Sequence, residues 1–259
     1  MPPRRMKPAV RGITHIFLDD GGVLNDNDRR GAEWRRLIGE FLSPRLGGEP
    51  LQWGEANRVV FEDQWERFQA WSRLHSLDEN YIDFFSDSVE SVRWLREMCE
   101  HVGVPAPDGA AELAAATARY VQERVRSGYE DAAPGVRALF EAGYTLATAS
   151  GGTSEELERY LDALGIRDCF AGRLYGPDLV RAHKAGPTYY ERILADSGFP
   201  SASTLVVDDN AQAIGWAAQA GMRTVHMCRR GEPATAEPAA AAGHAVGNLL
   251  ELVDLLNGS

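Results

Sequence analysis

The segment Ile13–Asp19 reads ITHIFLD and runs directly into the acidic, glycine-rich turn DDGG at 19–22. Its apolar and β-branched residues predict a buried strand that opens onto a loop. A second apolar run, TLVVD at 204–208, ends in the same way, at the pair Asp208 and Asp209. Two buried strands that both end in carboxylates are the observation from which the fold and a candidate site can be inferred.

Beyond Pro134, short apolar strands alternate with amphipathic helices, each of which closes on a glycine. The expected strands are 144–150, 172–176, 204–208 and 222–227. Strands that alternate with helices of this length predict a parallel sheet covered on both faces. The fold class is therefore expected to be α/β, with a Rossmann-like, doubly wound parallel sheet as its core.

The stretch 25–131 has a different character, because long amphipathic segments follow one another without a strand pattern. Five of the six tryptophans lie there, and their helical spacing favours the core of a small bundle over a substrate pocket. We expect a helical cap at 25–131, inserted into a catalytic core of 12–24 and 132–259, with a disordered basic tail at 1–11.

Composition narrows the classes of function. The chain has 259 residues, 44% of them hydrophobic, and a formal net charge of −11. A protein this acidic is a poor general binder of nucleic acid or of anionic membranes. It also lacks any apolar run approaching the roughly 20 residues of a membrane span. Its three scattered cysteines indicate neither a disulfide framework nor a zinc site. The expectation is a cytoplasmic protein without nucleic-acid or membrane partners.

Ligands of open parallel sheets bind at the carboxyl ends of the strands. Asp19 ends the first strand, and Asp208 and Asp209 end another. Three carboxylates that converge on one point repel each other unless a cation lies between them, and a hard dication such as Mg²⁺ suits oxygen ligands. The sequence thus predicts a magnesium site at this edge.

The other strand ends add groups that suit an anion. Backbone amides around Ala149, Ser150 and Gly151 precede a helix and are expected to form an anion-binding nest. Thr148 contributes a hydroxyl and Lys184 a fixed positive charge. A carboxylate, a metal, an anion cradle and a cation together suit attack on a phosphoryl group. The expected partner is a small anionic, phosphorylated substrate.

Four ordered motifs resemble those of the haloacid dehalogenase superfamily, in a member with an inserted helical cap. They are FLDDGGVLND, LATAS, HKAGP, in which Ala185 replaces the common proline, and VVDDN. The resemblance implies that Asp19 is the nucleophile, with Thr148 and Lys184 as catalytic partners. It also implies a metal held by Asp19, the carbonyl of Gly21, and Asp209, with Asp208 nearby.

One departure from the family pattern concerns Gly21, where family phosphatases usually carry an aspartate that acts as acid and base. General acid–base help of this kind is typically worth about 10²–10⁴-fold, and a glycine cannot supply it. Asp20 is an alternative, although alternation along the strand points it to the other face. A residue of the loop 25–28 is a further alternative, besides the turn and helix-capping roles such residues usually have.

We expect a magnesium-dependent hydrolase that transfers a phosphoryl group from a small metabolite through Asp19. One alternative is a 2-haloacid dehalogenase type of carbon–halogen hydrolase, because a halide leaves without protonation and such enzymes also lack the second aspartate. They work without a metal, however, and carry a less acidic fourth motif. Another alternative is a non-catalytic protein that binds a phosphorylated ligand through the same site.

Overall fold

A computed structural model of the protein describes residues 11–75, 77, 81, 84–85, 88–229 and 243–258. The chain divides into two compact units, one made of 1–26 with 128–259 and the other of 27–127. The boundaries expected from the sequence, after Leu24 and after Asp131, lie a few residues away from these. Most of the expected basic tail lies outside the described residues.

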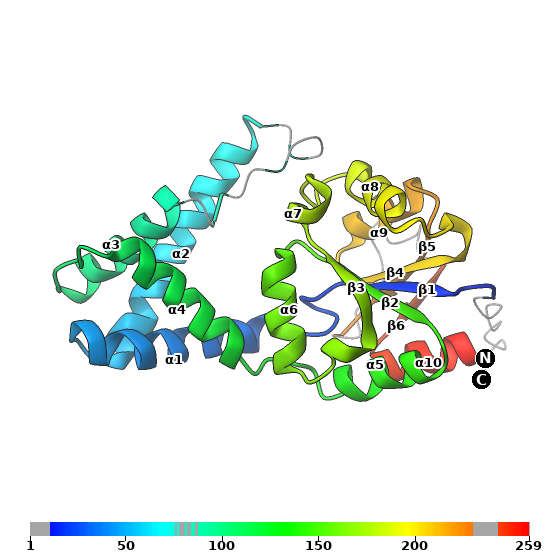
Figure 1. Cartoon of the computed structure of the whole chain (residues 1–259), viewed down its shortest axis with the longest axis horizontal. Coiled ribbons are helices and arrows are strands. Elements are labelled where there is room, and N and C mark those ends of the chain that lie inside the picture. The colour runs from blue at the N-terminus through cyan, green and yellow to red at the C-terminus, as the bar shows by residue number, and fades with distance from the viewer. Residues whose placement is uncertain are drawn as a thin grey trace, which may run out of the picture. The chain divides into compact units, whose positions relative to one another are not determined.

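The first unit is an α/β core around a parallel sheet of six strands (Figure 1). The strands are β1 (His15–Leu18), β2 (Thr145–Ala149), β3 (Phe170–Tyr175), β4 (Thr204–Asp208), β5 (Arg223–Met227) and β6 (His244–Val246). Their order in the sheet is β3-β2-β1-β4-β5-β6, and each pair of neighbours is parallel. The expected α/β fold with a doubly wound parallel sheet is confirmed.

Helices cover both faces of this sheet. They are α5 (Ala132–Glu141), α6 (Ser154–Ala163), α7 (Pro177–Val180), α8 (Pro187–Ser197), α9 (Ala211–Gln219) and α10 (Leu249–Asn257), with short 3₁₀ turns at Arg167–Cys169 and Ser201–Ser203. Helices α5, α6 and α10 pack on one face, whereas α7, α8 and α9 pack on the other (Figure 1).

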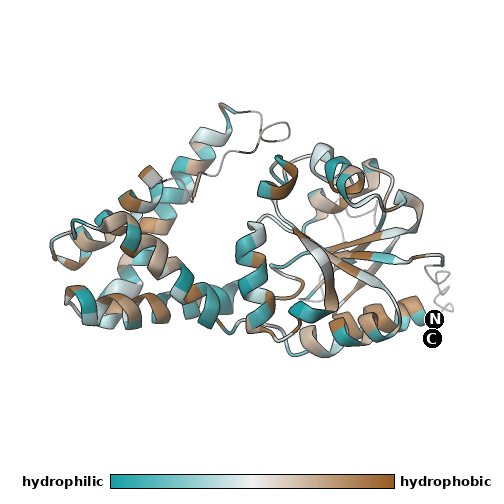
Figure 2. Ribbon diagram, viewed as in Figure 1, coloured by the Kyte–Doolittle hydropathy of each residue, from teal (hydrophilic) through white to brown (hydrophobic). Residues whose placement is uncertain are grey.

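Strand β1 lies at the centre of the sheet because its side chains are apolar on both faces. Ile16 and Leu18 pack with the cluster under α5, α6 and α10, whereas Phe17 packs with the cluster under α8 and α9. All three residues are fully buried, and Figure 2 shows hydrophobic residues along the central strands. Full burial of such a side chain stabilises the fold by about 1.5–3 kcal/mol. The nucleophile candidate that follows β1 is thus attached to a strand that is buried on both faces of the sheet.

The described residues of the second unit form the helices α1 (Asn27–Leu46), α2 (Pro50–Ser72), α3 (Ser88–Val102) and α4 (Ala110–Arg124). Trp53 and Trp94 lie in its core and donate their indole N–H groups to the Gly47 carbonyl at 2.8 Å and to Asn57 Oδ1 at 3.0 Å. Trp65, in contrast, is 44% exposed and stacks with Phe68 and Phe85. The expectation that the tryptophans fill the bundle core therefore holds for two of these three.

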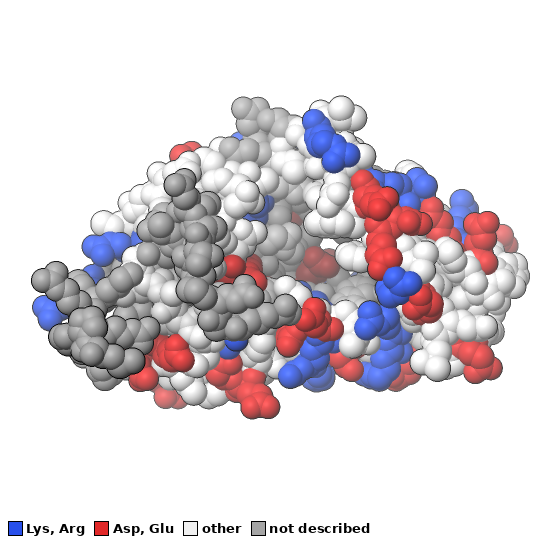
Figure 3. Space-filling model, turned by 180° about the vertical axis from the view of Figure 1, so that it is seen from behind, with Lys and Arg blue, Asp and Glu red and all other residues white. Residues whose placement is uncertain are grey.

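Charged side chains on the described surface of the helical unit are largely paired with each other. Arg58 contacts Glu55 and Glu62 along α2, and Arg67 reaches Glu90 and Glu97 of α3. Acidic and basic residues also lie intermingled on the face drawn in Figure 3. Neither arginine is thus an unpaired cation held ready for a substrate anion.

None of the described helices combines the length and the hydrophobicity that crossing a bilayer demands.

Candidate active site

Asp19 follows β1 directly and lies in the middle of the carboxyl edge of the sheet. Its backbone N–H donates to the Val207 carbonyl at 3.0 Å, which ties the end of β1 to β4. Burial raises the pKa of the Asp19 carboxyl to about 6, with Lys184 opposing the rise and Asp208 adding to it. The carboxylate is thus largely removed from water but ionised near neutral pH, which is the state that a nucleophile requires.

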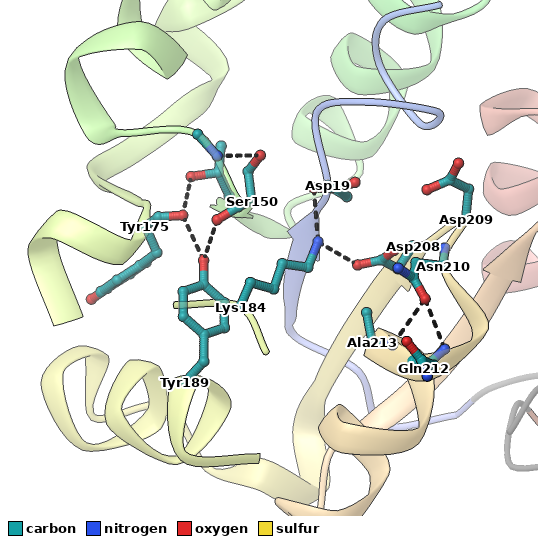
Figure 4. Close-up of polar contacts among 12 residues, drawn as sticks. Asp19, Ser150, Tyr175, Lys184, Tyr189, Asp208, Asp209, Asn210, Gln212 and Ala213 are labelled. Atoms are coloured by element: carbon teal, nitrogen blue, oxygen red, sulfur yellow. Dashed lines mark hydrogen bonds and ion pairs between the residues drawn. The ribbon is translucent and has the colours of Figure 1, made fainter. Parts of the chain in front are cut away.

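Lys184 lies between two of the carboxylates (Figure 4). Its Nζ atom is 2.8 Å from Asp19 Oδ1 and 2.6 Å from Asp208 Oδ2. Burial alone would lower the pKa of Lys184, but the two carboxylates outweigh it and hold this pKa well above its usual range. The ammonium group therefore stays charged and fixes the position of the Asp19 side chain.

Asp208 and Asp209 end β4 but differ in environment. Asp208 is fully buried, and its Oδ1 accepts the Asn210 N–H at 2.8 Å. Asp209 is exposed to solvent, and its pKa is raised, first by partial burial and then by Asp19. Together with Asp19 they offer carboxylate oxygens that all lie within 4.8 Å of one another. Three hard oxygen donors at this spacing fit a divalent cation such as Mg²⁺.

The loop after Asp19 closes through its own backbone. The N–H groups of Leu24 and Asn25 donate to the Asp20 carbonyl at 2.9 and 2.8 Å, and Gly21 forms a bridge with Asn25. The buried Asp20 carboxylate accepts the Asn25 side-chain amide at 2.6 Å. Two of the alternatives considered for the missing acid, Asp20 and Asn25 of the loop 25–28, thus bind each other and close the turn.

Because Gly22 has no side chain, the loop can pack closely against the Asp209 carboxylate. Its φ angle is +76°, and a Cβ atom added there would lie 1.9 Å from Asp209 Oδ2. We expect Gly22→Ala to lower the free energy of unfolding by about 1–2 kcal/mol for the left-handed backbone alone, and further by displacing Asp209. Thermal and urea unfolding measure the total loss of stability, from the backbone strain and from the displacement of Asp209.

Gly12→Ala is the matched control for this substitution. Gly12 has a φ of +78°, but nothing lies within 4 Å of an added Cβ. Gly12→Ala therefore has the same left-handed backbone strain as Gly22→Ala, but it makes no contact with Asp209. Equal losses of stability in the two variants would contradict the close packing of Gly22 against that carboxylate.

At the end of β2 the structure corrects the predicted hydroxyl. Thr148 is fully buried within the strand, and its hydroxyl donates to the Tyr175 carbonyl of β3 at 3.3 Å. Ser150 is the residue that leaves the strand, and it lies on the same side of the site as Lys184 in Figure 4. The hydroxyl at the strand end is therefore that of Ser150, two residues beyond the predicted one.

The predicted anion nest is largely filled by the protein itself. Ser150 N–H donates to the Tyr175 carbonyl at 3.2 Å, and Gly152 N–H contacts the Ser150 hydroxyl at 3.4 Å. Ser154 N–H, at the start of α6, donates to Asp178 Oδ1 at 2.9 Å. The helix N-terminus, where an anion is most favoured, thus already carries a carboxylate. Ala149 lies within β2, and Gly151 is the remaining member of the predicted set.

Sequence reasoning missed two tyrosines on α8. The hydroxyl of the buried Tyr189 contacts the carbonyls of Ser150 and Tyr175 at 2.8 and 3.0 Å, holding the end of β2 against β3 (Figure 4). Tyr190 is fully buried, and the pKa of its hydroxyl is raised well above its usual range by burial, with Lys184 opposing. Both tyrosines lie within six residues of Lys184 in the sequence, and this nearness is the signal that could have identified them.

Comparison with known proteins places this geometry in a family. A family model described as haloacid dehalogenase-like hydrolase matches residues 15–221. The (S)-2-haloacid dehalogenase 4A of Burkholderia cepacia is 33% identical over 130 residues. This match covers 50% of the chain and 55% of that protein, so the chain spans about half the length of the curated relative.

Solved structures resemble the whole chain. The crystal structure of an L-2-haloacid dehalogenase matches with a TM-score of 0.65 and 24% identity, over 95% of this chain and 99% of the other. The HAD-hydrolase YfnB of Bacillus subtilis, bound to magnesium, matches with a TM-score of 0.66 and 18% identity, over 95% and 100% of the two chains. Identities of this size speak for a shared fold alone.

These comparisons correct the functional expectation. The sequence favours phosphoryl transfer, but the curated relative is named as a haloacid dehalogenase. The structure also places Asp178 at the N-terminus of α6, where its carboxylate accepts the Ser154 N–H that would otherwise be available to an anion. The interpretation as a phosphatase that acts on a phosphorylated substrate is therefore wrong. The assignment of Ala149, Ser150 and Gly151 to anion binding stays a prediction.

Proposed function

Because the chain belongs to the haloacid dehalogenase-like hydrolases, we propose that it hydrolyses the carbon–halogen bond of a 2-haloacid, with Asp19 as the nucleophile. The observation that carries this proposal is the buried Asp19 carboxylate, held at 2.8 Å by Lys184 and followed at position 21 by a glycine. A halide leaves as a stable anion, so the reaction needs no acid at position 21. The name of the Burkholderia cepacia relative supports the same substrate class.

The reaction proceeds in two displacements. An Asp19 carboxylate oxygen attacks the carbon that bears the halogen, and the halide leaves with the bonding electron pair, which forms an ester. Water then attacks the ester, releases the 2-hydroxy acid and a proton, and regenerates the Asp19 carboxylate. Asp209, the exposed carboxylate with an oxygen within 4.8 Å of Asp19, is the base that we assign to this water in the metal-free enzyme.

Lys184 serves this reaction through charge and position. Its ammonium group orients the Asp19 carboxylate and keeps both Asp19 and Asp208 compatible with burial. It carries a permanent positive charge beside the point where a substrate carboxylate arrives. Ser150, at the end of β2, is the hydroxyl on that side of the site (Figure 4).

We also propose that the cluster of Asp19, Asp208 and Asp209 binds Mg²⁺, with the Gly21 carbonyl as a further ligand. A bound cation would offset the mutual repulsion of these carboxylates, although Lys184 already occupies one oxygen of Asp19 and one of Asp208. Titration calorimetry with MgCl₂ should show binding that is weakened in Asp209→Asn. Identical heats in the two proteins would remove Asp209 from the site.

The function is tested by halide release from 2-chloro- and 2-bromopropionate. We expect release of halide that persists in the presence of a chelator, with bromide leaving faster than chloride because it is the better leaving group. An activated aryl phosphate serves as the control and should not be turned over. Phosphate release that requires Mg²⁺, without any release of halide, would contradict the proposal.

A further inference from the structure

Arg229 follows β5 and binds two other segments of the core unit. Its Nη1 atom lies 2.6 Å from Asp131 Oδ1 at the start of α5, and Nη2 donates to the Val23 carbonyl. Its guanidinium group also lies 3.9 Å from the centroid of the Tyr129 ring. The side chain is only 11% exposed, so it acts as an internal connection, not as a surface charge.

The segments that Arg229 joins are the two through which the chain leaves and re-enters the core. The outgoing segment is the loop that begins at Asp19 and closes at Asn25. The returning segment begins at Gly128, which forms an antiparallel bridge with Asn25, and Tyr129 N–H donates to the Leu24 carbonyl at 3.0 Å. The nucleophile loop is thus bound to the returning segment on one side and to Arg229 on the other.

Asp131 anchors this arrangement to the body of the core. Its second oxygen, Oδ2, accepts the Leu249 N–H at 2.7 Å, at the start of α10. Arg229 therefore holds the Val23 carbonyl against a carboxylate that is itself fixed to another helix. A planar guanidinium can donate to the carboxylate and the carbonyl together, whereas an ammonium group is a single point charge.

We propose that Arg229 is a positioning residue for the nucleophile: by binding the Val23 carbonyl and Asp131, it fixes the loop 20–25 and so the direction of the Asp19 carboxylate. The role of Asp19 in this statement rests on the proposed function, whereas the restraint of the loop does not. Displacement of a reacting group by about 1 Å can cost on the order of 10²-fold in rate, so a residue that does not touch the substrate can still control turnover.

The first test does not depend on any substrate. Hydrogen–deuterium exchange is measured by mass spectrometry on the full chain in wild type, Arg229→Met and Arg229→Lys. We expect amides of the loop 20–25 to exchange at least about tenfold faster in Arg229→Met, with Arg229→Lys intermediate. Arg137→Met is the control in the same unit, because Arg137, although 47% exposed, also binds a carbonyl, that of Gly165, and a carboxylate, that of Asp168.

The second test separates positioning from stability. We expect kcat for halide release to fall by roughly ten- to a hundredfold in Arg229→Met, with KM nearly unchanged, and part of the rate to return in Arg229→Lys. A purely structural role would lower the melting temperature but leave kcat per folded molecule unchanged. Arg137→Met should keep kcat, because the structure places it away from the nucleophile loop.

The outcomes can be told apart. If wild type releases no halide, the proposed function fails, but the exchange experiment still decides whether Arg229 restrains the loop. If Arg229→Met does not fold, Asp131→Asn, which keeps an oxygen for Leu249 N–H and loses the ion pair, replaces it. Unchanged exchange at 20–25 together with an unchanged kcat, in folded variants, would overturn the proposal.

Discussion

Replacing Asp19 with asparagine should abolish halide release, with kcat falling by at least about 10³-fold. The amide is close in shape to the carboxylate but has no negative charge with which to displace a halide. It can still accept a hydrogen bond from Lys184, whose Nζ atom lies 2.8 Å from Asp19 Oδ1 in the wild type, so the fold should survive. Steady-state release of chloride from 2-chloropropionate measures the effect.

The control for this variant is Asp168→Asn, which removes an exposed carboxylate from the same unit and should leave the rate unchanged. A single turnover in H₂¹⁸O, with enzyme in excess, identifies the attacking oxygen. Product that carries no label, together with an Asp19 peptide that gains ¹⁸O, is the expected result. Label that appears directly in the product would show that water, and not Asp19, attacks the carbon.

The three carboxylates at the core of the site could be predicted from the sequence, because each of them lies at the end of a strand. Asp19, Asp208 and Asp209 each follow a buried apolar run, and the carboxyl ends of parallel strands meet at one edge of a sheet. Their convergence within 4.8 Å follows from the topology, which the alternation of strands and helices already predicts. Lys184 was expected at the end of a third strand, and the structure separates it from β3 by the short helix α7 but still brings it to the site.

The position of the hydroxyl was harder to predict, because it depends on where a strand ends. The run from Tyr144 to Ser150 does not show whether Thr148 lies inside the ladder or beyond it. The structure extends β2 to Ala149, so the Thr148 hydroxyl lies inside the sheet and Ser150 lies at its edge. Strand β6 was missed for a related reason, because HAV at 244–246 is too short to show alternation.

Proline gave a misleading boundary in the helical unit. Ser43–Pro44 is a pair of residues that usually marks a break between helices, but α1 continues to Leu46 with Pro44 inside it. A proline this close to the end of a helix removes one backbone hydrogen bond, and few turns follow it that could be disrupted. Arg45 also donates to the Phe41 carbonyl at 2.6 Å, which satisfies an acceptor of the last turn.

The acidic pair Asp208–Asp209 led the functional expectation toward a metal-dependent phosphatase. From sequence alone, adjacent carboxylates near Asp19 demand a cation, and Mg²⁺ is the usual solution. The structure shows that Lys184 already supplies a positive charge to two of the three carboxylates. It also shows Asp178 at the N-terminus of α6, a contact between elements that no local pattern reveals. These long-range contacts are what the sequence could not provide.

Replacing Lys184 with methionine should be the most destabilising single change at the site. It leaves Asp19 and the fully buried Asp208 without their shared cation, and breaking a buried ion pair by removing one partner costs roughly 3–5 kcal/mol. Halide release should fall as well, because nothing then orients the Asp19 carboxylate. Urea unfolding at pH 8 and a halide assay measure the two effects.

The loss of stability in Lys184→Met should shrink as the pH falls. The pKa of Asp19 is about 6 even with Lys184 in place, and that of Asp208 is also raised by burial; removing the ammonium group raises both further. In the unfolded chain these groups titrate near pH 4, so the folded variant binds protons that the unfolded chain releases. Its free energy of unfolding should therefore increase from pH 8 toward pH 5, by up to about 1.4 kcal/mol per pH unit for each proton.

The double variant Lys184→Met with Asp208→Asn should recover part of the stability at pH 8 and lose part of the pH dependence. A difference between wild type and Lys184→Met that stays constant from pH 8 to pH 5 would show that Lys184 is not the charge that makes these buried carboxylates tolerable.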